Sequence, residues 1–560
     1  MNFELPATGS EPRPAFVNAV ACQDWLSSVP LANAVQAQSM FLRQLNLLHR
    51  FSLPPLERFA ILESLRGPLS DVQEVAARKF AGKPLPFAPH EQAALDSNLS
   101  VWHMLALGYL RCFVVFCCGN SSIASLPALA AHRALIAGNA DLATKTATLA
   151  QRTVSVFVDW QLDLCRGELL PDSSYWKNLQ QIMSAAETLG IATRAVNDPV
   201  RQGSLSTSAL AAYAESNLLA TANPYELPAR HLAWVARWAR RWAPKLALLK
   251  TPPEDIRNRA VPLWVDLESD RPASYVPQAS KGGRWLETTE LRKSLLARIA
   301  LLEHGRTPAE LQLGDDVTQP AAGQLLQHLL QRWCKGKAAR RDDRHPASGG
   351  CSLIAGFEAV HYELSGRQAF QAPAGDGGTP RRGREELEAL GDRSYRLGSA
   401  GDGQGSTVED WQVMDDWRLH DQSSSGLRIT RPLRKGMRVG AGLLIAVKTH
   451  DGQQFTLGSL RWALREADDV LAAGIQLFPG MAKPVALRTV ESDQNRGAWQ
   501  PGFLLAEGAT PAQPASIVVA AGTFRAERGV EAMVDQQVQA FKLIAVLDRG
   551  VQFERCTIHA

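Results

Sequence analysis

The chain reads DQSSSG at residues 421–426, and the sequence after this stretch decides the fold of the second half. Three strand-like runs follow one another: LRITRPLRKGMRVGAGLLIAV at 427–447, FTLGSLRWALRE at 455–466 and AAGIQLFPG at 472–480. Leu460, Trp462 and Leu464 alternate with Arg461 and Arg465, a period of two that is typical of an antiparallel strand with one buried face. The sequence therefore predicts consecutive antiparallel strands downstream of DQSSSG.

A basic motif lies upstream of these runs. Residues 340–344 read RRDDR, and together with DQSSSG they complete the two-part pattern RxxxR…(D/N)xSxxG. The segment 335–485 therefore resembles the PilZ family, whose members bind the bacterial second messenger cyclic di-GMP. The resemblance implies a six-stranded antiparallel β-barrel that binds this nucleotide through Arg340, Arg341, Arg344, Asp421, Ser423 and Gly426.

The chemistry of these residue types suits that ligand. The O6/N7 edge of guanine matches the planar fork of an arginine, and two arginines four residues apart can clamp a phosphate, a guanine edge or a guanine face. Asp421 can accept the N1–H and N2–H donors of guanine as charge-assisted hydrogen bonds. Ser423 can donate or accept, and Gly426 permits either a positive φ or a close approach of the backbone.

The spacing of the two motifs departs from the family pattern. Arg344 and Asp421 are 77 residues apart, whereas family members usually place a few tens of residues between them. The excess maps onto 366–409, which is glycine-rich, charged and nearly free of large apolar residues. Such a segment cannot bury enough apolar surface to offset its ordering entropy, so we expect a mobile insertion between two strands.

Length and composition bound the organisation of the chain. A length of 560 residues is too great for one core, and a hydrophobic share of 45% with a net charge of +4 describes an ordinary globular protein. Eight cysteines occur without a CxxC pair, which favours reduced thiols in a cytoplasm over a disulfide framework. The N-terminus has no basic start followed by an apolar run, so we expect no signal peptide.

The pattern changes once along the chain. We expect a helical domain at 1–250, a helical or mixed segment at 251–334 that leads into a linker, the PilZ-like barrel at 335–485, and a β-rich domain or extension at 486–560. In the helical half, VPLWVDL at 261–267 is the one strand-like exception. The fold class is thus multidomain α + β: a helical N-terminal half, a PilZ-like antiparallel six-stranded barrel, and a C-terminal β-extension or second small β-domain.

Two helical stretches have alternative interpretations. VWHMLALGYLRCFVVFCC at 101–118 is apolar, but His103 and Arg111 interrupt it, so we expect a buried core helix and no integral membrane segment. WVARWARRWAPK at 234–245 places three tryptophans at i, i+4 and i+8 with arginines on the flanks. A stripe of this kind can stack on nucleic acid or lie at a membrane, but we expect the tryptophans to pack into the core.

Motifs for catalysis or for a metal are missing from the sequence: there is no phosphate loop, GxSxG or HExxH. We therefore expect a cytoplasmic bacterial signalling effector rather than an enzyme, with cyclic di-GMP as its ligand and no cofactor. Its helical half would rearrange or bind an unidentified protein partner, for example in motility, pilus or biofilm machinery. The alternatives are a partner-docking or structural protein whose degenerate barrel binds no nucleotide and, less favoured, a nucleic-acid-binding protein.

Overall fold

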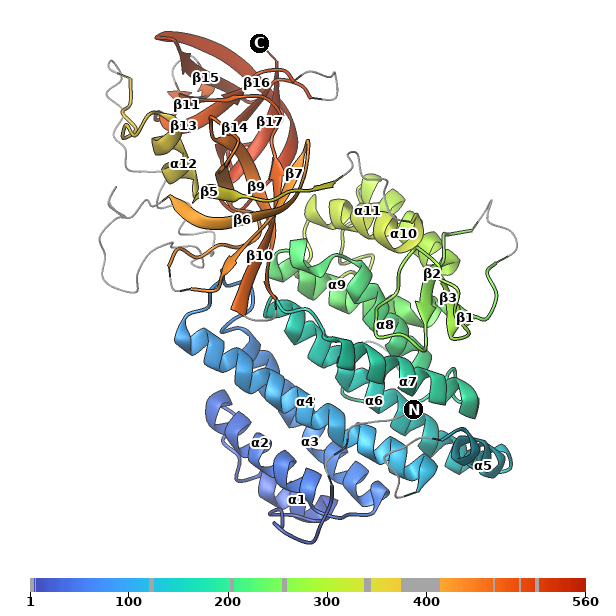
Figure 1. The fold of residues 1–560 in the computed structure, drawn as a ribbon. Helices are drawn as coiled ribbons and strands as arrows, with labels where there is room; N and C mark the ends of the chain where they lie inside the picture. The colour runs from blue at the N-terminus through green and yellow to red at the C-terminus, as the bar shows by residue number, and fades with distance from the viewer. Residues whose placement is uncertain are drawn as a thin grey trace. The chain divides into compact units, whose positions relative to one another are not determined.

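The computed structural model describes residues 5, 7–119, 125–201, 206–253, 259–336, 344–373, 413–434, 436–466, 469–492, 495–508 and 513–559. The chain divides into two compact units (Figure 1). One combines Met1–Ala81 with Ala88–Ala339, and the other combines Gly82–Phe87 with Arg340–Ala560. Arg340 and Arg341, and most of the insertion predicted at 366–409, lie outside the described residues.

The first unit is mainly helical, as the sequence predicts. Its helices are α1 (Ala19–Leu26), α2 (Ala34–Arg50), α3 (Pro55–Ala77), α4 (Pro89–Cys118), α5 (Leu126–Ala137), α6 (Ala140–Arg166), α7 (Ser173–Leu189), α8 (Ala209–Thr221), η1 (Pro224–Glu226), α9 (Ala229–Trp242), η2 (Ala243–Lys245), α10 (Thr289–Glu303) and α11 (Ala321–Cys334). Asn18, Asn33 and Asn139 cap α1, α2 and α6, because each side chain accepts a hydrogen bond from a backbone N–H of the first turn.

A small antiparallel sheet interrupts the helices. It has the order β1–β3–β2, with β1 at Ala247–Leu249, β2 at Leu263–Asp266 and β3 at Gly283–Glu287. Strand β2 forms inside the stretch 261–267 that the sequence predicts to be extended, and Leu263 and Val265 are fully buried.

Helix α4 contains the most apolar stretch of the chain. It is the one helix among the described residues that is long and apolar enough to cross a membrane, but 67% of its most apolar window is buried inside the protein. Val101, Leu105 and Tyr109 are completely buried in the core of the helical unit. Helix α4 is therefore a buried core helix, as the sequence predicts.

The tryptophan stripe of α9 is part of the same core. Trp234, Trp238 and Trp242 are each at most 1% exposed. The indole of Trp238 donates to the carbonyl of Leu313 at 2.8 Å, so its polar atom is satisfied. The prediction that these side chains pack inside the protein is confirmed.

The second unit contains a closed barrel of six antiparallel strands. The strands are β5 (Gly350–Ala355), β6 (Met414–Ser423), β7 (Gly426–Pro432), β8 (Leu444–Thr449), β9 (Thr456–Glu466) and β10 (Val470–Leu477). Neighbours around the ring are β6–β5–β8–β9–β10–β7, and a β6–β7 pairing closes it. The short strand β4 (His345–Pro346) pairs with β6, and helix α12 (Phe357–Leu364) follows β5.

A loop of the helical region completes this first barrel. Residues 82–87 join α3 to α4 in sequence, yet they belong to the barrel unit. The backbones of Leu85 and Val439 exchange two hydrogen bonds of 2.8 and 2.7 Å, and the guanidinium of Arg438 donates to the carbonyl of Pro84. Leu85 is 2% exposed and packs in the barrel core with Ile445 and Leu471. We call residues 82–87 the barrel strap.

The C-terminal residues form a second closed barrel (Figure 1). Its strands are β11 (Ala482–Ser492), β13 (Gln500–Leu505), β14 (Ser516–Ala520), β15 (Gly529–Val534), β16 (Gln537–Arg549) and β17 (Phe553–His559), and β12 (Asn495–Arg496) pairs with β11. When β5–β10 are matched in chain order to β11 and β13–β17, every strand has the same neighbours in both rings. The two barrels therefore share one topology.

The two barrels pack through apolar outer faces. Phe503 and Val518 of the second barrel join Ile354 and Leu444 of the first in one buried cluster, and helix α12 adds Val360. In the second barrel this contact uses strands β13, β14 and β17. The corresponding strands of the first barrel are β6, β7 and β10, which carry DQSSSG and its neighbours instead. The outer face of these three strands is thus apolar in the second barrel and polar in the first.

Candidate functional site

The stretch DQSSSG forms the tight hairpin between β6 and β7. Ser423 and Gly426 are partners in the register, so two residues make the turn. A Cβ on Gly426 would lie 2.9 Å from the carbonyl oxygen of Ile475 on β10, and the φ of Gly426 is not in the left-handed region. Of the two roles predicted for this glycine, the structure therefore supports the close approach of backbones.

An irregularity in β6 turns the motif side chains outward. The register with β7 shifts between Leu419 and Asp421, which leaves His420 unpaired in the ladder. Before the shift, Leu419 pairs with the core residue Ile429. After it, Asp421 pairs with Arg428, one residue before Ile429 in β7. Because successive strand residues point to opposite faces, Asp421 and Arg428 lie on the outer face of the barrel.

The two halves of the motif meet at this hairpin. Strand β4 pairs with β6 through His345 with Gln422 and Pro346 with Asp421, and this pairing carries Arg344 to the motif. Nη1 of Arg344 donates to Oδ1 of Asp421 at 2.7 Å. Both side chains keep about a quarter to a third of their surface exposed, 31% for Arg344 and 25% for Asp421. The ion pair is therefore open to solvent.

Arg344, Asp421, Ser423 and Gly426 thus occupy one small area. The position of a Cβ on Gly426 would be 3.8 Å from both Nη2 of Arg344 and Oγ of Ser423. Ser423 Oγ donates weakly to the carbonyl of Gly426 at 3.4 Å. Arg340 and Arg341, which the sequence also predicts at this site, lie outside the described residues.

The outer face continues beyond the predicted residues. Across β7, β10 and β9, the register places Arg428 opposite Gly474 and Gly474 opposite Trp462. The indole of Trp462 covers Gly474, where a Cβ would lie 2.1 Å from its Nε1. Nη2 of Arg428 donates to Oε1 of Glu466 at 2.7 Å. The alternation in the sequence places Leu460 and Trp462 on one buried face, but the register of β9 with β10 shifts between Gly474 and Ile475. Leu460 therefore lies in the core and Trp462 on the outer face.

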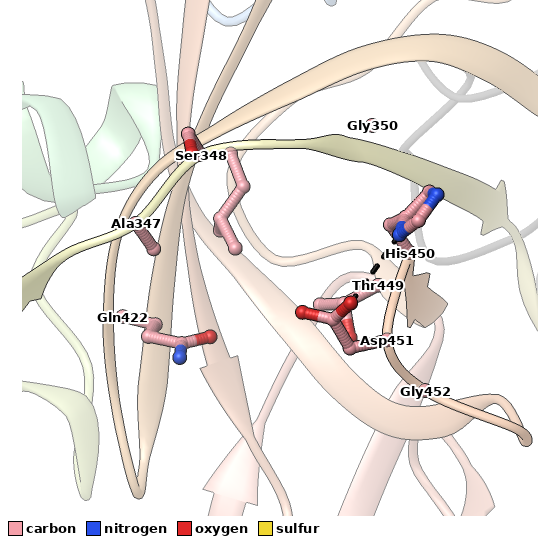
Figure 2. Close-up of a pocket in the computed structure, with 9 residues that line it drawn as sticks. Ala347, Ser348, Gly350, Gln422, Thr449, His450, Asp451 and Gly452 are labelled. Carbon is pink, nitrogen blue, oxygen red and sulfur yellow. Dashed lines mark hydrogen bonds and ion pairs between the residues drawn. The ribbon is translucent and has the colours of Figure 1, made fainter.

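A polar pocket lies at the same end of the first barrel as the DQSSSG hairpin, on the side of β6 that faces β5 rather than β7 (Figure 2). Its volume is about 220 Å³, and Gln422 of the motif lines it. Nδ1 of His450 and Oδ1 of Asp451 lie within hydrogen-bonding distance at 3.3 Å, but the two side chains are 80% and 96% exposed. The remaining lining residues are Ala347, Ser348, Gly350, Leu419, Thr449 and Gly452. Within the described part of the chain, histidine, cysteine and carboxylate side chains do not gather into a metal-binding group.

The fold and the convergent motifs define the class of protein: a multidomain protein built around a PilZ-type barrel. Three family models match successive parts of the chain. They are described as the N-terminal domain of cyclic-di-GMP receptor FimW at 20–254, its middle PilZ domain at 263–414, and the FimW C-terminal β-barrel domain at 485–560. The chain belongs to the PilZ-domain cyclic-di-GMP receptor family.

A curated relative extends over most of the chain. The cyclic-di-GMP receptor FimW of Pseudomonas aeruginosa is 22% identical over 527 residues, which cover 88% of this chain and 82% of that protein. The match to the middle PilZ domain begins at residue 263, so the PilZ region lies in the middle of the chain and not only in its C-terminal half. That match ends at residue 414, before DQSSSG.

Proposed function

We propose that the chain is a cyclic di-GMP receptor whose ligand binds on the outer face of the first barrel, at Arg344, Asp421, Ser423 and Gly426, together with Arg340 and Arg341. The observation that carries the proposal is the meeting of Arg344 and Asp421 at 2.7 Å, although 77 residues separate them in sequence. The pairing of β4 with β6 brings the two motif halves together in spite of the long insertion. The name of the related receptor supports the same ligand.

Each residue has a chemical role in this proposal. The guanidinium groups bind phosphate oxygens or the O6/N7 edge of guanine. The carboxylate of Asp421 accepts from the N1–H and N2–H groups of guanine, and the hydroxyl of Ser423 adds a donor or acceptor. Gly426 keeps β7 close to β10 and leaves room beside Arg344 and Ser423.

Arg344 and Asp421 form an ion pair of 2.7 Å, and the two side chains are 31% and 25% exposed. An ion pair that is partly exposed to water stabilises a fold only slightly, by about 0–1 kcal/mol. Exchange of these contacts for contacts with the nucleotide therefore costs little. The side chains are held near their binding positions before the ligand arrives, which reduces the entropy lost on binding.

We further propose that the protein acts as a cytoplasmic effector and not as an enzyme. Binding at Arg344 would fix the connection between the helical unit and the barrel, and the two ends of the barrel strap give two further covalent links between them. Ligand binding would then change the arrangement of the helical half or its contact with a protein partner of motility, pilus or biofilm machinery. A coupling of about 1–3 kcal/mol is typical of such systems.

Titration calorimetry of the full chain with cyclic di-GMP tests the binding proposal. We expect a dissociation constant of about 1 µM or lower, and Arg344→Ala or Asp421→Ala should weaken binding by about 2–4 kcal/mol. The matched control is Arg434→Ala, which removes the same charge from an exposed position beyond the other end of β7. Absence of binding by the parent protein would instead support a degenerate barrel that serves in partner docking.

A further inference from the structure

Arg428 belongs to the same outer face as the motif, although it is not part of it. It follows Gly426 by two residues and is the register partner of Asp421. Cross-strand partners on one face have their Cβ atoms about 5 Å apart, so the side chains of Arg428 and Asp421 leave the backbone at neighbouring positions. A nucleotide bound at Asp421 would therefore lie within reach of the Arg428 guanidinium.

Arg428 is held by a carboxylate from another strand. Its Nη2 donates to Oε1 of Glu466 at 2.7 Å, and the two side chains are 36% and 30% exposed. The partner of Arg428 on the intervening strand is Gly474, which has no side chain to block this path. Glu466 lies at the end of β9, on the same face as Trp462.

We propose that Arg428 is a further ligand-binding arginine of this site, and that Glu466 limits the affinity by competing with the ligand for it. The inference rests on the proposed function, because it assumes that cyclic di-GMP binds beside Asp421. Phosphate and the guanine O6/N7 edge are both good partners for an arginine fork, so Arg428 would leave Glu466 for the ligand.

The position of Glu466 makes its effect on the ligand unfavourable. The nucleotide carries two phosphate charges, and a carboxylate within a Debye length of about 10 Å repels them. Because the Arg428–Glu466 pair is partly exposed, water screens it and the arginine can exchange partners readily. Neutralising Glu466 should therefore release Arg428 and remove a repulsion at the same time.

Calorimetric titration of the full chain with cyclic di-GMP tests this inference with two variants. Glu466→Gln should bind about 3–10-fold more tightly than the parent protein, and Arg428→Ala should bind at least about tenfold more weakly. The matched controls are Asp469→Asn and Arg465→Ala, which disrupt a second exposed ion pair of 2.7 Å near Glu466 and should change affinity less than about twofold.

The salt dependence gives a second readout that a purely structural role would not change. If Arg428 contacts a phosphate, Arg428→Ala should lower the slope of log affinity against log salt concentration. If the parent protein binds cyclic di-GMP and both Arg428→Ala and Glu466→Gln bind it as tightly as the parent does, the inference is wrong and the proposed function stands. If the parent protein does not bind cyclic di-GMP, both the inference and the proposed function are wrong. Arg428→Lys replaces Arg428→Ala if circular dichroism shows the alanine variant to be unfolded, and weaker binding by the lysine variant supports the inference.

Discussion

At the scale of single residues, Gly426 is required by the space around it. A Cβ at this position would meet the carbonyl oxygen of Ile475 at 2.9 Å, a backbone atom that cannot rotate away. The sequence alone is compatible with either a positive φ or a close approach at Gly426, because both give the same preference for glycine. Only the pairing of β7 with β10 distinguishes them.

Gly426→Ala should therefore destabilise the first barrel. Overpacking against backbone typically costs about 1–3 kcal/mol, so we expect a lower melting temperature by calorimetry. Gly350→Ala is the control, since nothing lies within 4 Å of its Cβ position and its φ is not in the left-handed region. Equal melting temperatures for the two variants would contradict the close-approach explanation.

We expect His49 to make the helical unit sensitive to acid. It is 2% exposed, its Nε2 lies 2.6 Å from the carbonyl of Met104, and burial lowers the pKa of His49 from 6.5 to about 4. Below pH 6.5 the unfolded chain takes up a proton that the folded state takes up only near pH 4. The stability due to neutral His49 is therefore complete above pH 6.5 and is lost as the pH falls toward 4.

The lowered pKa of His49 corresponds to about 3 kcal/mol, because one pKa unit is worth 1.36 kcal/mol. His49→Gln keeps a hydrogen-bond donor but cannot titrate. We expect denaturant unfolding to show that the parent protein loses more stability than His49→Gln between pH 7 and pH 4.5. Parallel losses in the two proteins would show that His49 does not titrate in this range.

At the scale of elements, α9 shows what a periodic pattern can predict. The spacing of its tryptophans places them on one face of a helix. That face is expected to be buried, because removing so large an apolar surface from water is favourable. Helices and strands with a strong period are predictable in this way. The neighbours of each strand are not, because pairing depends on residues distant in sequence. The strands β1 and β3 and the closure of the second barrel were not predicted for that reason.

Trp238→Ala should destabilise the helical unit by about 3–5 kcal/mol, as removal of a buried aromatic side chain does. Arg237→Ala, one residue earlier, alters a side chain that is 48% exposed in an ion pair with Asp316 and should cost less than about 1 kcal/mol. Thermal unfolding measures both. A Trp238→Ala variant as stable as Arg237→Ala would show that the stripe is not part of the core.

The candidate site was predicted in part. The motif pattern names Arg344 and Asp421, and the structure brings them together. Arg428 and Glu466 carry no comparable signature, because their contact depends on the registers of three strands and on a glycine between them. The shift of register at His420, which turns Asp421 outward, also has no signal in the local sequence.

At the scale of the whole molecule, the barrel strap was the least predictable feature. Its sequence, GKPLPF, reads as a break between two helices. Instead, Pro84 accepts hydrogen bonds from Arg438, which lies 354 residues away. Because of the strap, the chain passes between the helical unit and the barrel unit two more times, in addition to the connection before Arg344.

Leu85→Ala should destabilise the first barrel by about 2–4 kcal/mol, because it opens a cavity in a closed core. Leu56→Ala, at a side chain that is 42% exposed on α3, is the control and should have little effect. Hydrogen exchange of the barrel strands would report the loss directly. Unchanged exchange in β8 and β10 would show that the strap is not an integral part of the barrel.

Hydrogen exchange of the full chain, with and without cyclic di-GMP, tests the receptor proposal most directly. We expect slower exchange at 344–347 and 420–428, where ligand would bind, and a further change at 82–87 if binding is transmitted through the strap. Protection limited to the motif residues would support binding without transmission. Identical exchange at 344–347 and 420–428 with saturating ligand would contradict the proposal that this barrel is a cyclic di-GMP receptor.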